Sequence, residues 1–591
     1  MTLGILLTKA TCGDSSELQQ YIVGALHKKA QGNSTAYGEM IEVIDAERDD
    51  AELAVLLTCL IRCTSCLQRK HHSSLIHSIF AHSWRTNRAL TPHLEALAVN
   101  SVSANADLLS LILFELVKQL TLFNLNPTGN DASSAIDSAG KEAEHPSSDA
   151  ADVQKAKDVH TVVRRVLETF PTGIMCYLDL LVNSFPHHRK DLSELVCFLG
   201  NMLHVTEYLP QLQDGILNHV VDRLIRLDVE IDPEAISVGH DANSTEGLFD
   251  IDIDDSSTSE RSENMKAVEK LDAMMTLMFR FFHKNLGKRA GHDRDQVFSV
   301  LLRIFDSRVL TTFRSKYVQF LCFYSCHFRE RYSREFLQYL MTKVVERSNP
   351  DNERHAAGSY LGSFLARARF VKLPMVQKSL SLLTKWILEY IDEVSPTVHE
   401  PDPYQHSLFY GLVQALLYVL CFRVPQLVAD ERNYDTFLRF ELQLDVITRC
   451  SLNPLKVINQ NVSKQFVRIC VKYKLLQAEM LRNLLAYNQS IVVNGVLEFE
   501  QEHSFFPFDN YNLPLSRTFI DGANEASSSQ LGSSVEDAEG VAMSLNSQLS
   551  LSDQGPHNSF SPSWKPMSFS PPHEEKMNGM RMLAESQMRA R

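Results

Sequence analysis

Three cysteines followed by two histidines have types and spacing that could hold a metal ion. Zinc needs thiolate or imidazole ligands that converge as a tetrahedron, and structural sites usually take their cysteines from CxxC turns. Here the cysteines recur at helical spacing inside the apolar sequence LAVLLTCLIRCTSCL, and a buried free cysteine behaves as a small apolar residue. We therefore interpret them as the buried side of a helix, and we expect neither a metal nor a cofactor. The five residues are Cys59, Cys63, Cys66, His71 and His72.

Motifs of catalysis are missing from the sequence. It contains no GxxxxGK[ST], HExxH, GxSxG or dinucleotide-binding glycine pattern. Paired acids occur in the segment 230–263, which lacks the regular pattern that would hold them in a catalytic geometry. We therefore expect a protein that is not an enzyme.

Basic side chains gather at two short turns. The first follows Pro186 at an expected helix start, and the second follows a helix rich in small residues. A solvated turn is the simpler interpretation of each, and binding of an acidic partner is the functional one. The candidate partner-binding residues are His188, Arg189, Lys190, Arg367, Arg369 and Lys372.

A longer basic segment, 280–343, holds thirteen Lys or Arg against five Asp or Glu. The surrounding chain is acidic, with a formal net charge of −14. Cations on helix faces and at helix ends explain such a segment as well as a binding function does. The functional interpretation is a surface that steers an acidic protein or a nucleic-acid backbone.

Five serines are candidates for phosphorylation. Ser184 and Ser193 flank the first basic turn, where a phosphate would add nearly two negative charges. Ser257 precedes Glu260 by three residues in the acidic segment, and Ser561 and Ser570 each precede a proline. Kinases need accessible substrate, which favours serines in segments without periodicity.

Length and composition indicate several helical units. The chain has 591 residues, which exceeds what one hydrophobic core supports. Its eleven scattered cysteines suggest reduced thiols in the cytosol or nucleus. Its acidic balance disfavours non-specific binding of nucleic acid by the whole molecule. We find no apolar run long enough for a membrane span.

Helical periodicity dominates the chain, as in the pattern Leu380, Leu383, Ile387. Many helices of similar length with short turns predict an all-α, elongated HEAT or armadillo-like solenoid. Small residues such as Gly358 and Gly362 predict a close approach of two helices. We expect helical repeats over 14–229 with a mobile loop at 126–158, an acidic disordered loop at 230–263, further repeats over 264–520, and a serine-rich disordered tail over 521–591.

Near the end of the expected repeats, Phe505–Phe508 forms the aromatic cluster FFPF. It predicts either a plug over the last helices or an exposed anchor for a partner, and we favour the plug.

Four stretches in order carry a family resemblance: 348–371 (SNPDNERHAAGSYLGSFLARARFV), 199–231, 451–473 and 505–520. They strongly resemble the RNA polymerase I-specific transcription initiation factor TIF-IA family. The resemblance implies a non-enzymatic HEAT-repeat protein that binds RNA polymerase I at its stalk subunits. It implies a bridge to the promoter-bound core factor, or selectivity factor, at ribosomal RNA genes in the nucleolus. It also implies control by regulatory kinases, and a homodimer is compatible with the fold.

Two other classes of protein remain as alternatives. A nuclear transport receptor is also an acidic helical solenoid, although the four matched stretches argue against it. A direct promoter-DNA-binding module would use Arg367, Arg369 and Lys372 and would lose affinity steeply with salt.

Overall fold

The computed structural model describes residues 3–11, 15–46, 50–82, 90–125, 148–231, 255–288, 292–312, 315–394, 402–429, 434–477, 479–483, 486, 506–509 and 511–528. Within these ranges the regular structure is helical and contains no strand.

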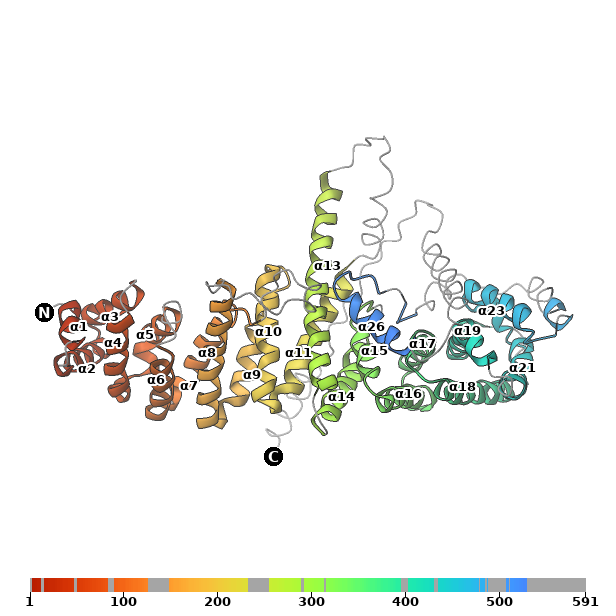
Figure 1. Cartoon of the computed structure of the whole chain (residues 1–591), viewed down its shortest axis with the longest axis horizontal. Coiled ribbons are helices and arrows are strands. Elements are labelled where there is room, and N and C mark those ends of the chain that lie inside the picture. Colours follow the sequence, from red (N-terminus) through yellow and green to blue (C-terminus); the bar gives the residue numbers. More distant parts are fainter. Residues whose placement is uncertain are drawn as a thin grey trace, which may run out of the picture. The chain divides into compact units, whose positions relative to one another are not determined.

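Eleven α-helices are described in the part of the chain before the acidic segment (Figure 1). They are α1 (Leu3–Thr11), α2 (Ser16–Ala30), α3 (Thr35–Asp45), α4 (Asp50–Arg62), α5 (Arg69–His82), α6 (Thr91–Ala104), α7 (Leu109–Gln119), α8 (Ser148–Thr169), α9 (Ile174–Asn183), α10 (Leu192–Tyr208) and α11 (Gln213–Glu230).

The helices described after the acidic segment are α13 (Asp255–Phe282), α14 (His292–Ile304), α15 (Phe320–Cys326), α16 (Glu330–Val345), α17 (Asp351–Arg367), α18 (Leu373–Val394), α19 (Ser407–Val428), α21 (Leu444–Arg449), α22 (Pro454–Val457), α23 (Gln460–Tyr473) and α26 (Arg517–Ser528). Short π-helical turns occur at η6 (His283–Lys288), η7 (Phe305–Val309) and η8 (Tyr434–Glu441).

The helices alternate between two layers. One layer runs α4, α6, α8, α10, α13, and the other runs α3, α5, α7, α9, α11, α14, each helix touching the next in its layer. The alternation continues with α17, α19 and α23 against α16, α18 and α21. Such stacking of helix pairs is the arrangement of HEAT-type repeats, so the predicted all-α repeat fold is confirmed.

Amphipathic periodicity explains why these segments fold as helices. In α11 the buried residues Ile216, Val220 and Leu224 recur every four positions, while Arg226 on the same helix is exposed. Each helix therefore has one apolar face, and the neighbouring helices of both layers bury this face away from water.

Helices α17 and α19 approach each other closely. An added Cβ at Gly362 would lie 2.6 Å from Ala415 Cβ, and one at Gly358 would lie 2.5 Å from Leu412 Cδ2. Real Cβ atoms do not approach that closely. Glycine is therefore required at Gly362, where the backbone Cα of Ala415 also lies 2.9 Å from the added atom, whereas at Gly358 the end of the Leu412 side chain would have to shift. The close approach predicted from the small residues is confirmed.

Helix α19 is also long and apolar enough to cross a membrane. The most apolar stretch of α19 is 94% buried inside the fold. Within the described ranges it is the one helix that passes this test, and its apolar surface faces other helices rather than lipid.

Three predicted segment boundaries need correction. The loop expected at 126–158 ends earlier, because α8 begins at Ser148. The loop expected at 230–263 gives way to α13 at Asp255, and α26 extends eight residues into the expected tail, to Ser528. Segments 126–147, 232–254 and 529–591 lie outside the described residues.

The cysteine cluster also differs from its prediction. Helix α4 ends at Arg62, so Cys63 lies in a turn and Cys66 in the short 3-10 helix Thr64–Cys66. Cys59 and Cys63 are buried, whereas Cys66 is half-buried. No group of three or more potential metal-binding side chains occurs among the described residues. The helical stripe therefore extends only as far as the end of α4.

The segments 506–509 and 511–528, here called the C-terminal strap, pack back onto the middle of the repeats. Phe508 is 3% exposed, and its ring lies 5.2 Å from that of Phe323 and 5.4 Å from that of Phe320. Asp272 accepts backbone hydrogen bonds from Leu515 and Ser516 at 2.7 and 2.9 Å. Phe508 is therefore buried as a plug, but it packs on α15 in the middle of the repeats rather than over the last helices as predicted. Phe505 lies outside the described residues.

A buried histidine joins α8 to α10. His160 Nε2 lies 3.1 Å from Asn201 Oδ1, and its Nδ1 lies 2.9 Å from the Tyr208 hydroxyl. Burial, reinforced by His204, lowers the pKa of His160 to about 3; Asn201 and Glu207 offset part of this shift. The folded protein therefore holds this imidazole neutral, while the unfolded chain protonates it below its ordinary pKa of about 6.5.

Acidification should destabilise the fold through His160. Because the pKa is lower in the folded state, the stabilisation is complete above about pH 6.5 and is lost as the pH falls towards 3. The loss attributable to His160 should be about 2 kcal/mol at pH 5. Denaturant unfolding from pH 7 to 5 should show a flatter pH dependence for His160→Gln than for the wild type. Equal slopes would contradict the assignment.

Candidate partner-binding surface

The first basic turn lies between α9 and α10. Its residues precede α10, which begins at Leu192, so they occupy a turn rather than the helix start that the sequence suggested. Arg189 and Lys190 are exposed and His188 is half-buried. Lys270 Nζ of α13 donates to the His188 carbonyl at 2.9 Å, which fixes the turn against a helix 82 residues further along.

This turn borders a polar cleft of about 640 Å3. Besides His188 and Arg189, the cleft is lined by the end of α11 and one face of α13, including Glu230, Lys266 and Lys270. Partial burial lowers the pKa of His188, and Glu230, whose carboxylate lies 3.8 Å away, offsets part of that effect. At neutral pH the positive charge of the cleft therefore comes from its lysines and from Arg189.

The candidate serines fall into four situations. Ser184 is half-buried just after α9, where its N–H donates to the Leu180 carbonyl at 3.0 Å. Ser193 is exposed in the first turn of α10. Ser257 belongs to helix α13 rather than to the predicted loop. Ser561 and Ser570 lie outside the described residues. Of these positions, Ser193 combines exposure with a helix N-terminus, which favours a negative group.

The second basic turn is not one surface, and this corrects its prediction. Arg367 is the last residue of α17, and its Nε lies 2.8 Å from Asp509 Oδ1 of the C-terminal strap; the two side chains are 15% and 16% exposed. Its guanidinium also lies over the Phe422 ring. Arg369 is half-buried, and its N–H donates to Asn524 Oδ1 at 3.2 Å.

Lys372 alone of the three basic residues is exposed, and it pairs with Glu330 at 2.7 Å. A surface for DNA or an acidic partner made of all three residues is therefore wrong, because Arg367 serves the fold.

Part of the positive charge in the basic segment 280–343 is compensated by acids from earlier helices. Lys284 pairs with Glu207 of α10 at 2.6 Å, and Arg303 pairs with Asp214 of α11 at 2.7 Å. Arg308 donates to Asn218 of the same helix at 3.1 Å. These contacts join neighbouring repeats, so the sequence excess of positive charge overstates the charge available to a partner.

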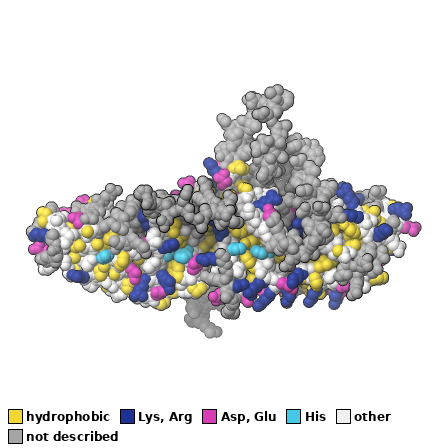
Figure 2. Space-filling view, viewed as in Figure 1, with side chains coloured by type: hydrophobic (Ala, Val, Ile, Leu, Met, Phe, Trp, Pro, Cys, Tyr) yellow, Lys and Arg dark blue, Asp and Glu magenta, His cyan; other side chains and the backbone are white. Residues whose placement is uncertain are grey.

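Some cations nevertheless remain exposed. Figure 2 shows Lys and Arg side chains gathered along the lower edge of the view, below α14, α16 and α18. Arg334 and Lys385 are 62% and 73% exposed even while paired with acids on their own helices. Exposed pairs of this kind contribute little to stability and leave the charge accessible.

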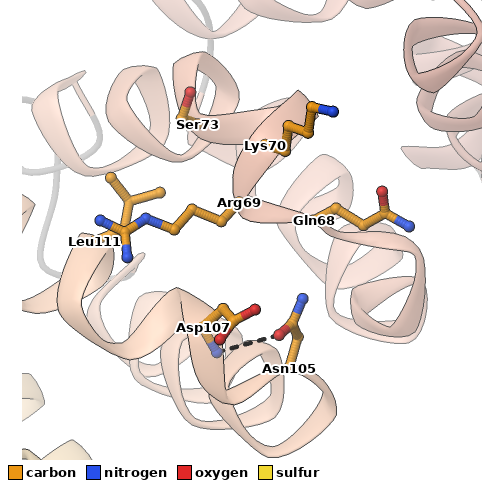
Figure 3. A pocket seen from close by; sticks show the side chains of 7 residues that line it. All are labelled: Gln68, Arg69, Lys70, Ser73, Asn105, Asp107 and Leu111. Carbon is orange, nitrogen blue, oxygen red and sulfur yellow. Dashed lines mark hydrogen bonds between the residues drawn. The ribbon is translucent and has the colours of Figure 1, made fainter.

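Another polar hollow, of about 700 Å3, lies where α5 meets the junction between the short 3-10 helix Ala106–Leu108 and α7 (Figure 3). Arg69 extends towards Leu111 and donates to Ser110 Oγ at 3.0 Å, while Lys70 points elsewhere. Asp107 N–H donates to Asn105 Oδ1 at 3.1 Å. The side chains do not converge on one point, so the hollow has the character of a docking surface rather than of a catalytic site.

The fold defines a helical-repeat protein whose surface carries charged clefts. A family model described as RNA polymerase I specific transcription initiation factor RRN3 matches residues 13–524. The chain therefore belongs to the family of RNA polymerase I-specific transcription initiation factors. Membership of a family of initiation factors also confirms the prediction that the chain is not an enzyme.

Individual relatives agree with the family. The chain is 29% identical over 389 residues to the factor RRN3 of Mus musculus, covering 61% of this chain and 59% of that protein. It is 24% identical over 546 residues to the factor rrn3 of Schizosaccharomyces pombe, covering 85% of each. A crystal structure of the RNA polymerase I transcription initiation factor Rrn3 superposes with a TM-score of 0.66 at 19% identity, covering 86% of this chain and 98% of that one. The matched part thus spans only about three fifths of the mouse protein.

Proposed function

We propose that this chain binds RNA polymerase I and links it to the promoter-bound core factor, or selectivity factor, at ribosomal RNA genes. The observation that carries the proposal is the family match over residues 13–524, which includes both halves of the repeat fold. Its relatives in Mus musculus and Schizosaccharomyces pombe are named RNA polymerase I-specific transcription initiation factors. The place of action would be the nucleolus.

A two-layer row of helices suits a linking role. Each repeat adds its own solvent-facing surface, so two large partners can bind different repeats at the same time. Holding both on one scaffold raises the effective concentration of the polymerase at the promoter. We assign the polymerase stalk subunits to the cleft beside Arg189. The positive charge of this cleft is exposed to solvent, and phosphorylation of a nearby serine could change it.

Regulation by kinases would act through the same cleft. A phosphate on the exposed Ser193 would lie at the N-terminus of α10, three residues after Lys190. It would add nearly two negative charges beside the basic turn and change its attraction for an acidic partner. Self-association of the chain stays a prediction, as does a weak contact with DNA.

Reversing the charge of the basic turn should weaken polymerase binding. We expect the double substitution Arg189→Glu and Lys190→Glu to reduce capture of purified RNA polymerase I about tenfold at low salt, because exposed charges steer encounter. Thermal unfolding should not change, since both side chains are exposed.

The matched control reverses two other exposed cations, Arg347 and Lys385, which are 81% and 73% exposed. This control should bind as the wild type does. If the double reversal at 189 and 190 binds normally, the cleft is not the polymerase site. If the control loses binding equally, net charge rather than position is responsible.

A further inference from the structure

Helices α16 and α18 enclose an apolar groove of about 740 Å3 that the described residues leave open. Its floor is apolar, and two of its side chains, Val345 and Leu382, are 49% and 45% exposed. An exposed apolar groove of this kind indicates a contact with another segment. The apolar lining consists of Leu337, Met341, Val345, Pro374, Met375 and Leu382.

One ion pair at each end of the groove shows how α16 and α18 are oriented. Lys372 pairs with Glu330 at 2.7 Å where both helices begin, and Arg347 pairs with Glu393 at 3.0 Å where both end. The two helices therefore run in the same direction. The 16 residues of α16 give the groove a length of about 24 Å.

Charges differ between these ends. Arg334 and Lys372 both pair with Glu330 at the first end, and Lys378 of α18 also lines the groove, while Glu346 lies at the far end. The first end thus carries an excess of positive charge, and the far end is negative. An occupant that is acidic where it enters would complement the groove.

The chain itself supplies a matching sequence directly after α26. Residues 534–546 read SVEDAEGVAMSLN. Ser534 and the acids that follow it are typical of a helix start. Between Arg517 and Lys565 the sequence contains no Lys or Arg. Apolar residues recur there at positions i, i+3, i+6, i+7 and i+10, as one face of a helix requires: Val535, Ala538, Val541, Ala542 and Leu545.

The end of α26 brings this sequence to the positive end of the groove. Asn524 contacts the backbone of Arg369, three residues before Lys372 at the first end. Six residues, 529–534, separate Ser528 from Val535 and can span about 20 Å. The acids Glu536, Asp537 and Glu539 would therefore enter beside the groove's cations.

We propose that residues 535–545 dock as an amphipathic helix in the α16–α18 groove of the same chain. Gly540 lowers the intrinsic helix stability of this segment, so the helix depends on the groove that receives it. An external partner that uses this groove must first displace the segment. The proposal is independent of the assignment of the polymerase site.

Two methionines in the groove provide a direct test in the full-length chain. Met341 and Met375 line the groove, Met175 is 63% exposed elsewhere, and Met274 is fully buried. Oxidation of each methionine by dilute hydrogen peroxide is followed by mass spectrometry. We expect slow oxidation of Met341 and Met375 in the wild type, and about tenfold faster oxidation in the variant Val541→Asp/Leu545→Asp.

The control Met543→Asp changes an apolar residue of the same segment that lies off the apolar face, and it should behave as the wild type. Met175 should react equally in all variants, and slow reaction of Met274 shows that each is folded. Leu382→Glu, on the groove side, should accelerate oxidation at Met341 in the same way.

Equal oxidation of Met341 and Met375 in the wild type and the double variant would overturn the proposal. Protection that survives the double variant but weakens on dilution would assign the groove to a second copy of the chain, and this would also overturn it.

Discussion

Replacing Gly362 by leucine should destabilise the protein by about 3 kcal/mol or more. The physical reason is the contact between α17 and α19, where even a methyl group would lie 2.6 Å from Ala415 Cβ and 2.9 Å from its Cα. The second atom belongs to the backbone, so the helices must separate rather than one side chain rotate. Chemical denaturation should show a lower midpoint with an unchanged slope.

Alanine substitutions at two glycines, Gly24 and Gly362, separate the effect of packing from that of helix propensity. Gly24 lies inside α2, and a Cβ there would meet nothing within 4 Å. Alanine in place of glycine favours a helix by about 1 kcal/mol at either position. Gly24→Ala should therefore stabilise the protein, whereas Gly362→Ala should destabilise it. A stabilising Gly362→Ala would contradict the close approach of α17 and α19.

Replacing Arg367 by methionine should cost about 3–5 kcal/mol. The substitution leaves the Asp509 side chain in a site where it is 16% exposed, with the Tyr418 hydroxyl, 2.5 Å away, still donating to its carboxylate. Leaving one member of a buried ion pair uncompensated is strongly destabilising. The C-terminal strap should also detach first, so limited proteolysis should cut near residue 510 faster than in the wild type.

Two further variants test whether the loss of stability comes from the buried ion pair. Lys372→Met removes a cation of the same turn whose side chain is 70% exposed, and it should change stability by less than about 0.5 kcal/mol. The double variant Arg367→Met/Asp509→Leu removes both charges and should recover most of the loss. If Arg367→Met were as mild as Lys372→Met, the buried ion pair would not exist in solution.

The difference between Arg367 and Lys372 shows what the sequence could not predict. Both lie in one basic turn, and local sequence gives no reason to separate them. Arg367 is buried because Asp509, 142 residues later, returns to it with the C-terminal strap. Long-range pairing of this kind leaves no local pattern. The positive segment 280–343 was overestimated for the same reason, since its compensating acids come from α10 and α11.

The fold itself was predictable because its determinants are local. Apolar spacing identified the helices, and the small residues around Gly362 identified a close helix contact before its partner was known. Helix boundaries were less predictable where a helix begins in sequence that lacks apolar periodicity. The first residues of α13 include Asp255 and Ser257, which belong to an acidic run without apolar periodicity. Composition therefore indicated a loop where the backbone is helical.

Direct binding to purified RNA polymerase I tests the central claim. The full-length chain should co-migrate with RNA polymerase I in gel filtration at moderate salt and should not co-migrate with RNA polymerase II. Addition of the purified core factor should give a larger complex that contains all three components only when this chain is present. A chain that is folded by circular dichroism but elutes alone, or that binds both polymerases equally, would contradict the proposed function.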